Sequence, residues 1–314
     1  MSRYVAATAY GGPEVLSIEE EEVGEPGSGQ VVVEVKAAGV NPADVKSYSG
    51  AFGTDPAALP KRLGFEAAGV VSAVGPDASG PAGAIIVGDE VIVFRTVGAY
   101  ADRIVVPADR VVPKPHSMSF EQAGGLMLTG ATAVHTLTAT DVGEGDTVLI
   151  HAASGGVGLM AVQLAKLRGA HVIGTASEGR YQQLRDLGVE PVTYGEGLAD
   201  RVRGLAPDGI DAAIDLVGTD EAIDVSLELV ANRDRIATIA GFRRGDIGIK
   251  LLGSGPGADP GTALRDAARL ELIDAVSRGQ LQVFVAATYP LAEVAAAHQD
   301  IMDGHTPGKI VLVP

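Results

Sequence analysis

The chain has 314 residues, and acidic side chains outnumber basic ones to give a formal net charge of −16 at pH 7. This charge argues against nucleic acid and anionic membranes as partners, because both are bound through clustered Lys and Arg. Cysteine is absent, which excludes disulfides, iron–sulfur clusters and thiolate zinc sites. The length is sufficient for two domains, each with its own core.

The first segment, MSRYVAATAYGG, lacks the basic and then apolar pattern of a secretion signal. No stretch of the chain approaches the roughly 18 uninterrupted apolar residues of a membrane-spanning helix. We therefore expect a soluble, cytoplasmic protein, and the lack of cysteine is compatible with that reducing compartment.

The first third of the chain is predicted to be rich in β-strands. Valine-rich runs separated by Gly, Pro and Asp occur at 30–37, 67–74 and 90–94. After the segment 113–115 the pattern becomes helical, with Ser119 placed to cap the helix that follows.

From residue 147 to 241 strands and helices alternate, which predicts a parallel sheet covered by helices and an α/β fold class. The later part of the chain is expected to continue with one more strand, a loop, a long helix and a closing strand. The predicted strands are 147–151, one ending at Thr175, 191–194, 212–216, 235–240, 246–252 and 309–313; the loop is 253–261 and the helix 262–278.

Residues 153–158 form a glycine-rich turn between a strand and a helix. The turn has G-x-G-x-x-G spacing, with alanine at the first position. Gly155 is expected to let the backbone approach a pyrophosphate, and Gly158 to let the helix pack closely on the strand. Gly169 follows where a C-cap glycine belongs. Strand, turn, helix and second strand in this order predict a Rossmann dinucleotide site, with the helix amino terminus facing the diphosphate.

The end of the second strand favours one cofactor over another. An NAD site offers Asp or Glu to the ribose hydroxyls about twenty residues after the turn, but this chain has Thr175-Ala176-Ser177 and then Arg180. A 2′-phosphate is not repelled there, and Arg180 can offer it a charge-assisted contact of about 1.5–3 kcal/mol. The sequence therefore favours NADPH over NADH; the alternative is that Arg180, beside Glu178, is a solvated helix residue.

Several separate motifs resemble the medium-chain dehydrogenase/reductase superfamily, and within it the zinc-free, zeta-crystallin-like quinone oxidoreductase branch. The resemblance covers nearly the whole chain. It implies a GroES-like β-barrel domain formed by both chain ends around a central Rossmann domain, with the active cleft between them. The implied domains are 1–127, 128–254 and a return to the first domain over 255–314. The motifs are AGVNPAD at 38–44, GFEAAGV at 64–70, VG at 74–75, GAYA at 98–101, GATA at 130–133, AASGGVG at 152–158 and GKIVL at 308–312.

The same resemblance implies residues that contact NADPH. Residues of the turn and of the next strand ends match the family's phosphate and adenosine positions, and residues after the later strands match backbone that lines the nicotinamide ribose and carboxamide. Phe52 is expected to pack against the nicotinamide or a ring substrate, and Thr132 and Lys309 are weaker candidates. The phosphate and adenosine positions are Ser154, Gly155, Gly156, Val157, Gly158, Ser177, Arg180 and Tyr194. The nicotinamide positions are Val217, Ala240, Gly241 and Phe242. Sheet core is the alternative for Val217 and Ala240.

Catalytic zinc is not expected. Zinc-dependent relatives carry Cys in the first motif and His before the Glu of the second, whereas this chain has Asn41-Pro42 and Phe65, so that Glu66 alone is retained. The six histidines show no metal-binding spacing. His135 and His151 are expected to cap or to hydrogen-bond in the core, and His116, His171, His298 and His305 to lie on the surface.

The predicted reaction is NADPH-dependent reduction of a conjugated carbonyl, either a quinone or the C=C bond of an enone. Asn41 can donate a hydrogen bond to the acceptor, and Lys46 and Tyr48 lie within one helical turn if their segment is helical. The alternatives are that Asn41 before Pro42 only shapes a turn and that Lys46 and Tyr48 are an ordinary surface pair. The family commonly shows Tyr near 46 and Arg near 48, so its usual pocket does not transfer whole.

Two other functions stay open. An enoyl-thioester reductase shares these motifs but needs a basic patch for a phosphopantetheine, for which Arg243 and Arg244 are the candidates. An NADPH-binding sensor or structural protein with negligible turnover is the non-enzymatic alternative. The resemblance also implies a homodimer that pairs through an exposed apolar strand at 246–252.

Overall fold

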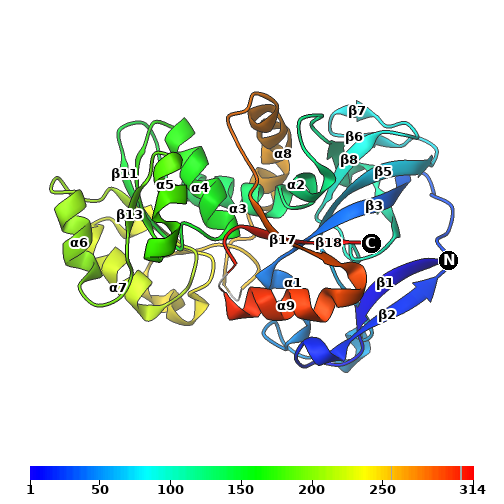
Figure 1. Ribbon diagram of the computed structural model, residues 1–314, viewed down its shortest axis with the longest axis horizontal. Coiled ribbons are helices and arrows are strands. Elements are labelled where there is room, and N and C mark those ends of the chain that lie inside the picture. The colour runs from blue at the N-terminus through cyan, green and yellow to red at the C-terminus, as the bar shows by residue number, and fades with distance from the viewer. Residues whose placement is uncertain (256, 305) are drawn as a thin grey trace. The chain divides into compact units, whose positions relative to one another are not determined.

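The path of the chain divides between two units, in the computed structural model that describes residues 1–255, 257–304 and 306–314. Unit 1 contains Met1–Leu128, Arg269–Arg278 and Val283–Pro314, and unit 2 contains Thr129–Ala268 and Gly279–Gln282 (Figure 1). The predicted domain boundaries at 127 and 254 stay a prediction; in the structure the chain first returns to unit 1 at Arg269.

Unit 1 is built on β-strands, as the valine-rich runs predict, and most of its strand pairings are antiparallel. Its larger sheet has the order β10-β8-β5-β3-β18-β17, with β9 also paired to β3, and two small sheets have the orders β2-β1-β4 and β6-β7. The bounds are β1 Ser2–Ala7, β2 Leu16–Glu21, β3 Gln30–Val40, β4 Lys61–Arg62, β5 Glu66–Val74, β6 Ser79–Gly80, β7 Gly83–Ala84, β8 Glu90–Phe94, β9 Arg103–Pro107, β10 Val111–Pro113, β17 Val285–Pro290 and β18 Lys309–Val313.

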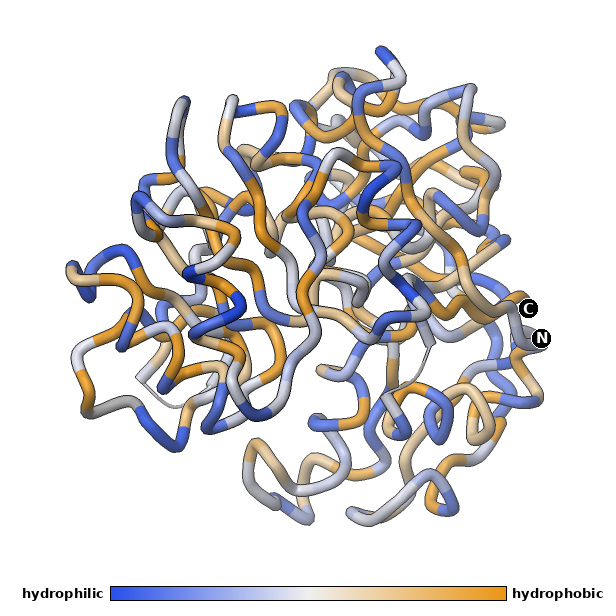
Figure 2. Tube along the Cα trace, turned by 60° about the vertical axis from the view of Figure 1, so that its left-hand side comes forward, coloured by the Kyte–Doolittle hydropathy of each residue, from blue (hydrophilic) through white to orange (hydrophobic). Residues whose placement is uncertain are grey.

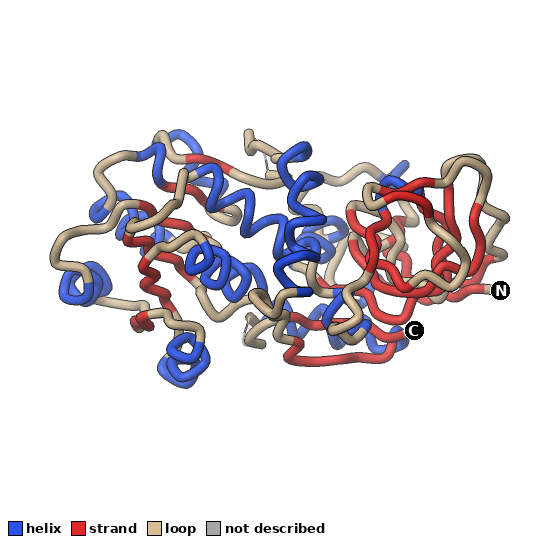
Figure 3. Tube along the Cα trace, turned by 90° about the horizontal axis from the view of Figure 1, so that it is seen from above, coloured by secondary structure: helices blue, strands red, loops and turns tan. Residues whose placement is uncertain are grey.

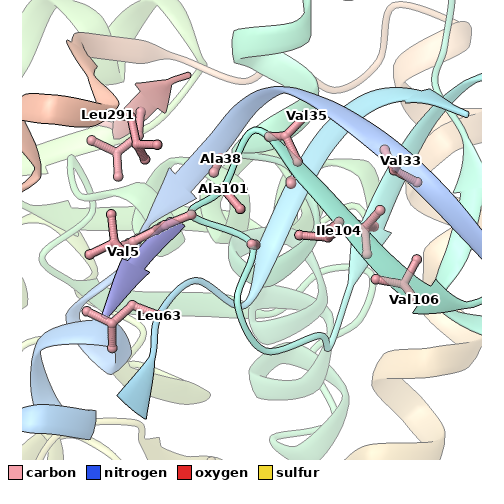
Figure 4. Packing of buried hydrophobic residues seen from close by; sticks show 14 of the residues in the cluster. Val5, Val33, Val35, Ala38, Leu63, Ala101, Ile104, Val106 and Leu291 are labelled. Carbon is pink, nitrogen blue, oxygen red and sulfur yellow. The ribbon is translucent and has the colours of Figure 1, made fainter. Parts of the chain in front are cut away.

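The two ends of the chain meet in this unit. The closing strand β18 pairs antiparallel with β3 and parallel with β17, so that Leu312 faces Ala38 and Ile310 faces Val40. The core beneath these strands is aliphatic, and Val5, Val33, Val35, Ile104 and Leu291 converge in it (Figure 4). This architecture confirms the GroES-like domain that the resemblance implies.

Short helices complete unit 1. Helix α1 (Pro42–Tyr48) begins at Asn41, whose backbone N–H donates to Asp44, and it contacts α9 (Val294–Asp303). Helix α2 (Phe120–Gly124) begins at Ser119, which caps it as predicted and forms a capping box with Gln122. Helices α3 (Met127–Ala139) and α8 (Thr262–Ser277) each contain residues of both units.

Unit 2 is a parallel sheet with helices in its connections (Figure 3). Its strand order is β13-β12-β11-β14-β15-β16, the order 3-2-1-4-5-6 of a doubly wound dinucleotide fold. The Rossmann prediction is therefore confirmed. The bounds are β11 Thr147–His151, α4 Gly156–Leu167, β12 His171–Thr175, α5 Tyr181–Asp186, β13 Glu190–Val192, α6 Leu198–Leu205, β14 Ala212–Asp215, α7 Asp220–Leu229, β15 Ile236–Thr238 and β16 Lys250–Leu251.

One predicted strand is mostly wrong. Of residues 246–252 only Lys250–Leu251 form β16, because a 3-10 helix occupies Phe242–Ile247 and Gly248 takes a left-handed conformation with φ +79°. The segment is also not an exposed apolar edge in the single chain, since Ile249 is 7% and Leu252 2% exposed. The predicted loop 253–261 contains one residue outside the described ones.

Short hydrophobic stretches alternate with hydrophilic ones along the chain (Figure 2). Among the described residues, none of the helices combines the length and the apolar character that crossing a membrane requires. The cytoplasmic location stays a prediction.

Candidate functional site

The carboxyl ends of the parallel strands in unit 2 meet at one edge of the sheet, where open α/β sheets bind ligands. The structure brings most of the predicted cofactor residues to this edge. They follow β11 (Ser154, Gly155, Gly156, Val157 and Gly158), β12 (Ser177 and Arg180), β13 (Tyr194), β14 (Val217) and β15 (Ala240, Gly241 and Phe242).

The glycine-rich turn is fixed by the neighbouring strand β12. Thr175 accepts the Ala152 N–H on its Oγ1 at 3.0 Å, and its carbonyl accepts the Ala153 N–H at 3.0 Å. Ala152 takes the left-handed φ of +55°, which turns the chain from β11 into α4. Gly155 is the N-cap of α4, so the first amides of this helix point out of the turn.

The two glycines of the turn have different structural reasons. A Cβ on Gly158 would lie 2.2 Å from the Ala152 carbonyl oxygen, so this glycine lets the helix pack closely on the strand, as predicted. A Cβ on Gly155 would meet only that same oxygen, at an ordinary 3.4 Å, and its φ of −77° suits any residue. Nothing within the described chain requires glycine at 155.

The ends of β12 and β13 carry the predicted adenosine residues. Ser177 is exposed and Arg180 half-buried, on either side of Glu178, and the Tyr194 side chain is 57% exposed. The Tyr194 segment is held by Arg201, whose guanidinium donates to the carbonyls of Thr193, Gly195 and Glu196 at 2.7–3.2 Å. Sequence reasoning missed Arg201, because an arginine on a polar helix carries no signal of its partners.

The ends of β14 and β15 present main chain and one apolar side chain. Val217 is 47% exposed, so the alternative that it is sheet core is wrong, whereas Ala240 is half-buried. Phe242 is half-buried, and a Cβ on Gly255 would lie 2.6 Å from its ring. Thr132, the weaker candidate, lies on α3 and is only 5% exposed.

Unit 1 contains a buried polar cluster around Glu66. Lys309 Nζ donates to the Val40 carbonyl, to Asn41 Oδ1 at 2.6 Å and to Glu66 Oε1 at 3.1 Å. Asn41 Nδ2 also donates to Glu66 Oε1 at 3.1 Å, and the Leu128 N–H donates to Glu66 Oε2 at 2.8 Å. Glu66, Asn41 and Lys309 are 0%, 1% and 4% exposed. These three contacts use every hydrogen of the Lys309 ammonium, so none is left to bond a cofactor. The contact of Lys309 with NADPH stays a prediction.

A second buried chain of hydrogen bonds starts at Asp44, which accepts the N–H groups of Asn41 and Gly64 and a bond from Tyr100. Burial raises the pKa of Asp44 to about 7. His298 lies between the two tyrosines, with Nδ1 2.8 Å from the Tyr48 hydroxyl and Nε2 3.4 Å from the Tyr100 hydroxyl. Burial lowers the pKa of His298 to about 4, so at neutral pH the ring is uncharged.

These contacts correct two predictions. His298 is 0% exposed, not a surface residue, because its ring stacks on Tyr48 and meets the edge of Tyr100. Lys46 and Tyr48 do share helix α1, but Tyr48 is fully buried, so the alternative of an ordinary surface pair is wrong. Lys46 is half-buried, which lowers the pKa of its ammonium, and Phe52 beyond the helix is 44% exposed.

The other described histidines behave as predicted. His135 lies 3.4 Å from Asp259 and accepts from Arg265, and His151 bonds the Ser226 hydroxyl at 3.1 Å, both in the core of unit 2. His116 and His171 are exposed, and the prediction for His305 falls outside the described residues.

The basic patch that an enoyl-thioester reductase requires is weakened by helix α7. Arg244 forms ion pairs with Asp224 at 2.7 Å and with Asp220 at 3.4 Å. Its charge is therefore compensated within unit 2, and Arg243 is not reinforced by it.

A doubly wound parallel sheet with an apolar and main-chain-lined carboxyl edge, together with a GroES-like sheet domain, defines the medium-chain dehydrogenase class. Two family models match accordingly: the alcohol dehydrogenase GroES-like domain over residues 27–116 and the zinc-binding dehydrogenase family over residues 187–312. A quinone oxidoreductase from Pseudomonas aeruginosa is 35% identical, with 100% of both chains covered. A 2-haloacrylate reductase from a Burkholderia species is 36% identical, with 97% of this chain and 96% of the relative covered.

Solved structures agree with these relatives. The Escherichia coli quinone oxidoreductase complexed with NADPH superposes with a TM-score of 0.86 at 29% identity and full coverage of both chains. A mycobacterial protein complexed with NADPH gives a TM-score of 0.86 at 32% identity, again over both full chains. The chain belongs to the quinone oxidoreductase branch of the medium-chain dehydrogenase/reductase superfamily.

One matched family is described as zinc-binding, but the residues around Glu66 do not suit a metal ion. Glu66, the residue retained from the zinc-binding pattern, already has an ammonium 3.1 Å from one carboxylate oxygen and a backbone N–H on the other. In the described parts of the chain, no three His, Cys, Asp or Glu side chains are grouped to hold a metal ion. Zinc does not fit the Glu66 cluster.

Proposed function

We propose that this chain is an NADPH-dependent oxidoreductase that transfers a hydride to a quinone or to an α,β-unsaturated carbonyl. The observation that carries the proposal is Gly155, a glycine that the protein's own packing does not require, at the amino terminus of α4. Close approach of a ligand phosphate to the main chain supplies the missing reason.

The choice of NADPH rests on the end of β12. Thr175, at the position after which an NAD site offers a carboxylate, is 3% exposed and bonds the turn through its hydroxyl. Beyond it lie the exposed Ser177 and the half-buried Arg180, which can receive a 2′-phosphate. The names of the NADPH-complexed relatives agree with this assignment.

The chemistry divides between cofactor and protein. When bound, NADPH supplies the hydride, which an electron-poor acceptor receives without a Lewis acid. The protein seats the diphosphate on α4 and lines the nicotinamide end with Val217, Ala240, Gly241 and Phe242. For the acceptor, Asn41, Lys46 and Tyr48 remain the predicted residues; of these Lys46 is the one whose side chain is not enclosed in the core of unit 1.

We infer that the reaction is zinc-independent. Support comes from the Glu66 cluster, where the Lys309 ammonium already pairs with the carboxylate that a zinc ion would need as a ligand. Dialysis against a strong chelator should leave the NADPH-dependent rate unchanged, and a loss restored by added Zn²⁺ would contradict the inference.

An acceptor panel tests the proposal. Purified protein and NADPH are incubated with 1,2-naphthoquinone, an enone such as 2-cyclohexenone, and crotonyl-CoA. We expect oxidation of NADPH with the quinone or the enone and a slower rate with the thioester, because Arg244 is paired with α7. A faster thioester rate favours the enoyl reductase, and binding without turnover on any acceptor favours the sensor.

We propose a homodimer that pairs through residues 246–252. Strand β16 does lie at the edge of the sheet, but Asp259 already bonds it, with its N–H donating to the Leu251 carbonyl at 2.8 Å. Sedimentation velocity decides the point: we propose a dimer at micromolar concentration, and a monomer there rejects it.

A further inference from the structure

Two short main-chain segments follow neighbouring strands of unit 2 and share one buried support. Asp215 ends β14 and Thr238 ends β15, and the two residues are paired across the sheet. Both are 0% exposed. Sequence reasoning assigned neither residue a role.

Asp215 holds the segment after β14. Its Oδ1 accepts the N–H of Val217 at 3.0 Å and that of Gly218 at 2.8 Å. Its backbone carbonyl also accepts the Ile239 N–H at 3.1 Å, so the residue reaches the segment after β15 as well.

Thr238 holds the segment after β15 in the same way. Its Oγ1 accepts the N–H of Ala240 at 3.1 Å and that of Gly241 at 2.8 Å, and it donates its hydrogen to Asp215 Oδ2 at 2.6 Å. A hydroxyl has one hydrogen and two lone pairs, so these bonds use it completely. Only Thr or Ser can supply this combination at the end of a buried strand.

The two segments are also nested sterically. A Cβ on Gly218, whose φ is +79°, would lie 2.7 Å from the Ala240 carbonyl carbon. A Cβ on Gly241 would lie 2.5 Å from Ile223 Cδ1 and 3.3 Å from Asp215 Oδ2. A shift of either segment therefore moves the other.

We propose that Asp215 and Thr238 are positioning residues that hold segments 217–218 and 240–241 as one rigid seat for the nicotinamide end of NADPH. This inference rests on the proposed function, because only a bound NADPH has a nicotinamide end. The new element is that two fully buried side chains, Asp215 and Thr238, fix the position of the nicotinamide. Loss of the hydrogen bonds from Asp215 and Thr238 to these segments should slow hydride transfer. It should not weaken binding of the adenosine end, whose residues follow β12 and β13.

The test compares Thr238→Val, which keeps the shape and removes the hydroxyl, with Thr238→Ser, which restores it. Thr136→Val is the matched control, because the Thr136 hydroxyl is equally buried but bonds only the Ala133 carbonyl of its own helix. For each protein we measure the melting temperature, the affinity for 2′,5′-ADP and for NADPH, kcat and KM with 1,2-naphthoquinone, and the isotope effect with NADPH deuterated at the transferred position.

For Thr238→Val we expect kcat to fall about tenfold to a hundredfold, as small misplacements of reacting groups do, with a larger isotope effect and unchanged 2′,5′-ADP affinity. Thr238→Ser should recover most of the rate, and Thr136→Val should match the wild type. An unchanged kcat and isotope effect in Thr238→Val, or a parallel loss of 2′,5′-ADP affinity, overturns the inference.

Asp215→Asn keeps the test decisive if Thr238→Val does not fold. An Asn amide group facing Thr238 donates to the hydroxyl, which then lacks a lone pair for one of its two backbone N–H donors. We expect the same drop in kcat with retained 2′,5′-ADP affinity, and wild-type kinetics would overturn the inference. A wild-type protein that binds neither nucleotide overturns the proposed function itself, whereas an active wild type with unaffected variants overturns the inference alone.

Discussion

The Glu66 cluster of unit 1 and the carboxyl edge of unit 2 were both candidates for function, and they differ in how their polar groups are satisfied. Around Glu66, the charges and amides of Asn41 and Lys309 meet one another in the core. At the sheet edge, the residues 154–157 at the start of α4 are half-buried with no side-chain cap at Gly155, and the Val217 and Tyr194 side chains are exposed. A site whose donors already have acceptors stabilises the fold, whereas an edge that keeps main-chain donors and apolar side chains accessible is suited to a ligand.

The largest expected effect separates the two glycines of the turn. Gly155→Val should abolish NADPH binding and leave the melting temperature close to that of the wild type, because a Cβ there has an ordinary contact distance. Gly158→Val should instead destabilise unit 2, since its Cβ would overlap the Ala152 carbonyl. Calorimetric titration and thermal unfolding measure both. Gly143→Val, at a position whose Cβ meets nothing within 4 Å, is the control. Retained NADPH affinity in Gly155→Val would break the assignment.

The Glu66 cluster should respond in stability. Lys309→Met leaves the Glu66 carboxylate buried without its cation, which typically costs about 3–5 kcal/mol of unfolding free energy. Lys36→Met removes an exposed partner of Glu34 and is expected to cost at most about 1 kcal/mol. Urea unfolding measures both variants. Equal small losses would mean that the Lys309 ion pair does not stabilise unit 1.

The adenosine end should respond in cofactor selectivity. Arg180→Ala is expected to weaken NADPH binding about tenfold or more, the loss of one charge-assisted hydrogen bond, and to leave NADH binding unchanged. Arg185→Ala, on the following helix with its guanidinium 5.4 Å from the Tyr181 ring centre, is the control. Similar losses for both nucleotides would show that Arg180 does not contact the 2′-phosphate.

The smallest expected effect is on the pH dependence of stability. Burial lowers the pKa of His298 to about 4, so the unfolded chain binds a proton that the folded chain does not between about pH 6.5 and 4. The stability that the neutral ring contributes is complete above pH 6.5 and is lost as the pH falls toward 4. Asp44 has the opposite effect on stability, because burial raises its pKa to about 7 in the folded chain. Its contribution to stability is lost as the pH rises toward 7.

His298→Asn should therefore flatten the part of the stability profile that falls between pH 6.5 and 4. Thermal unfolding across this range measures the difference from the wild type. His171→Asn, at an exposed position, is the control. A variant profile parallel to that of the wild type would contradict the role given to the buried imidazole.

The sequence predicted the parts of the fold that local patterns encode. Strands β8, β11 and β18 and the cap at Ser119 follow from valine runs and capping chemistry. The strand predicted at 246–252 is mostly wrong, because its apolar residues fit a strand but Gly248 takes a left-handed conformation. Only Lys250–Leu251 pair in the sheet. Lone histidines are similarly ambiguous: His298 is buried through contacts with Tyr48 and Tyr100, which lie far away in the sequence.

In the candidate site as well, some residues could be predicted from the sequence and others could not. Gly155 follows from the strand–turn–helix pattern over 147–176, and Val217 follows from the family resemblance. Asp215, Thr238 and Arg201 do not, since their importance lies in which backbone groups they bind across the fold.

The most direct test of the account is a titration of the purified chain with NADPH. The chain contains no Trp, so the emission of the reduced nicotinamide can be followed without a Trp background. We predict saturable binding with a raised melting temperature in the wild type and neither change in Gly155→Val. A wild-type chain whose melting temperature and NADPH emission stay constant throughout the titration would contradict the nucleotide site on which the proposed function rests.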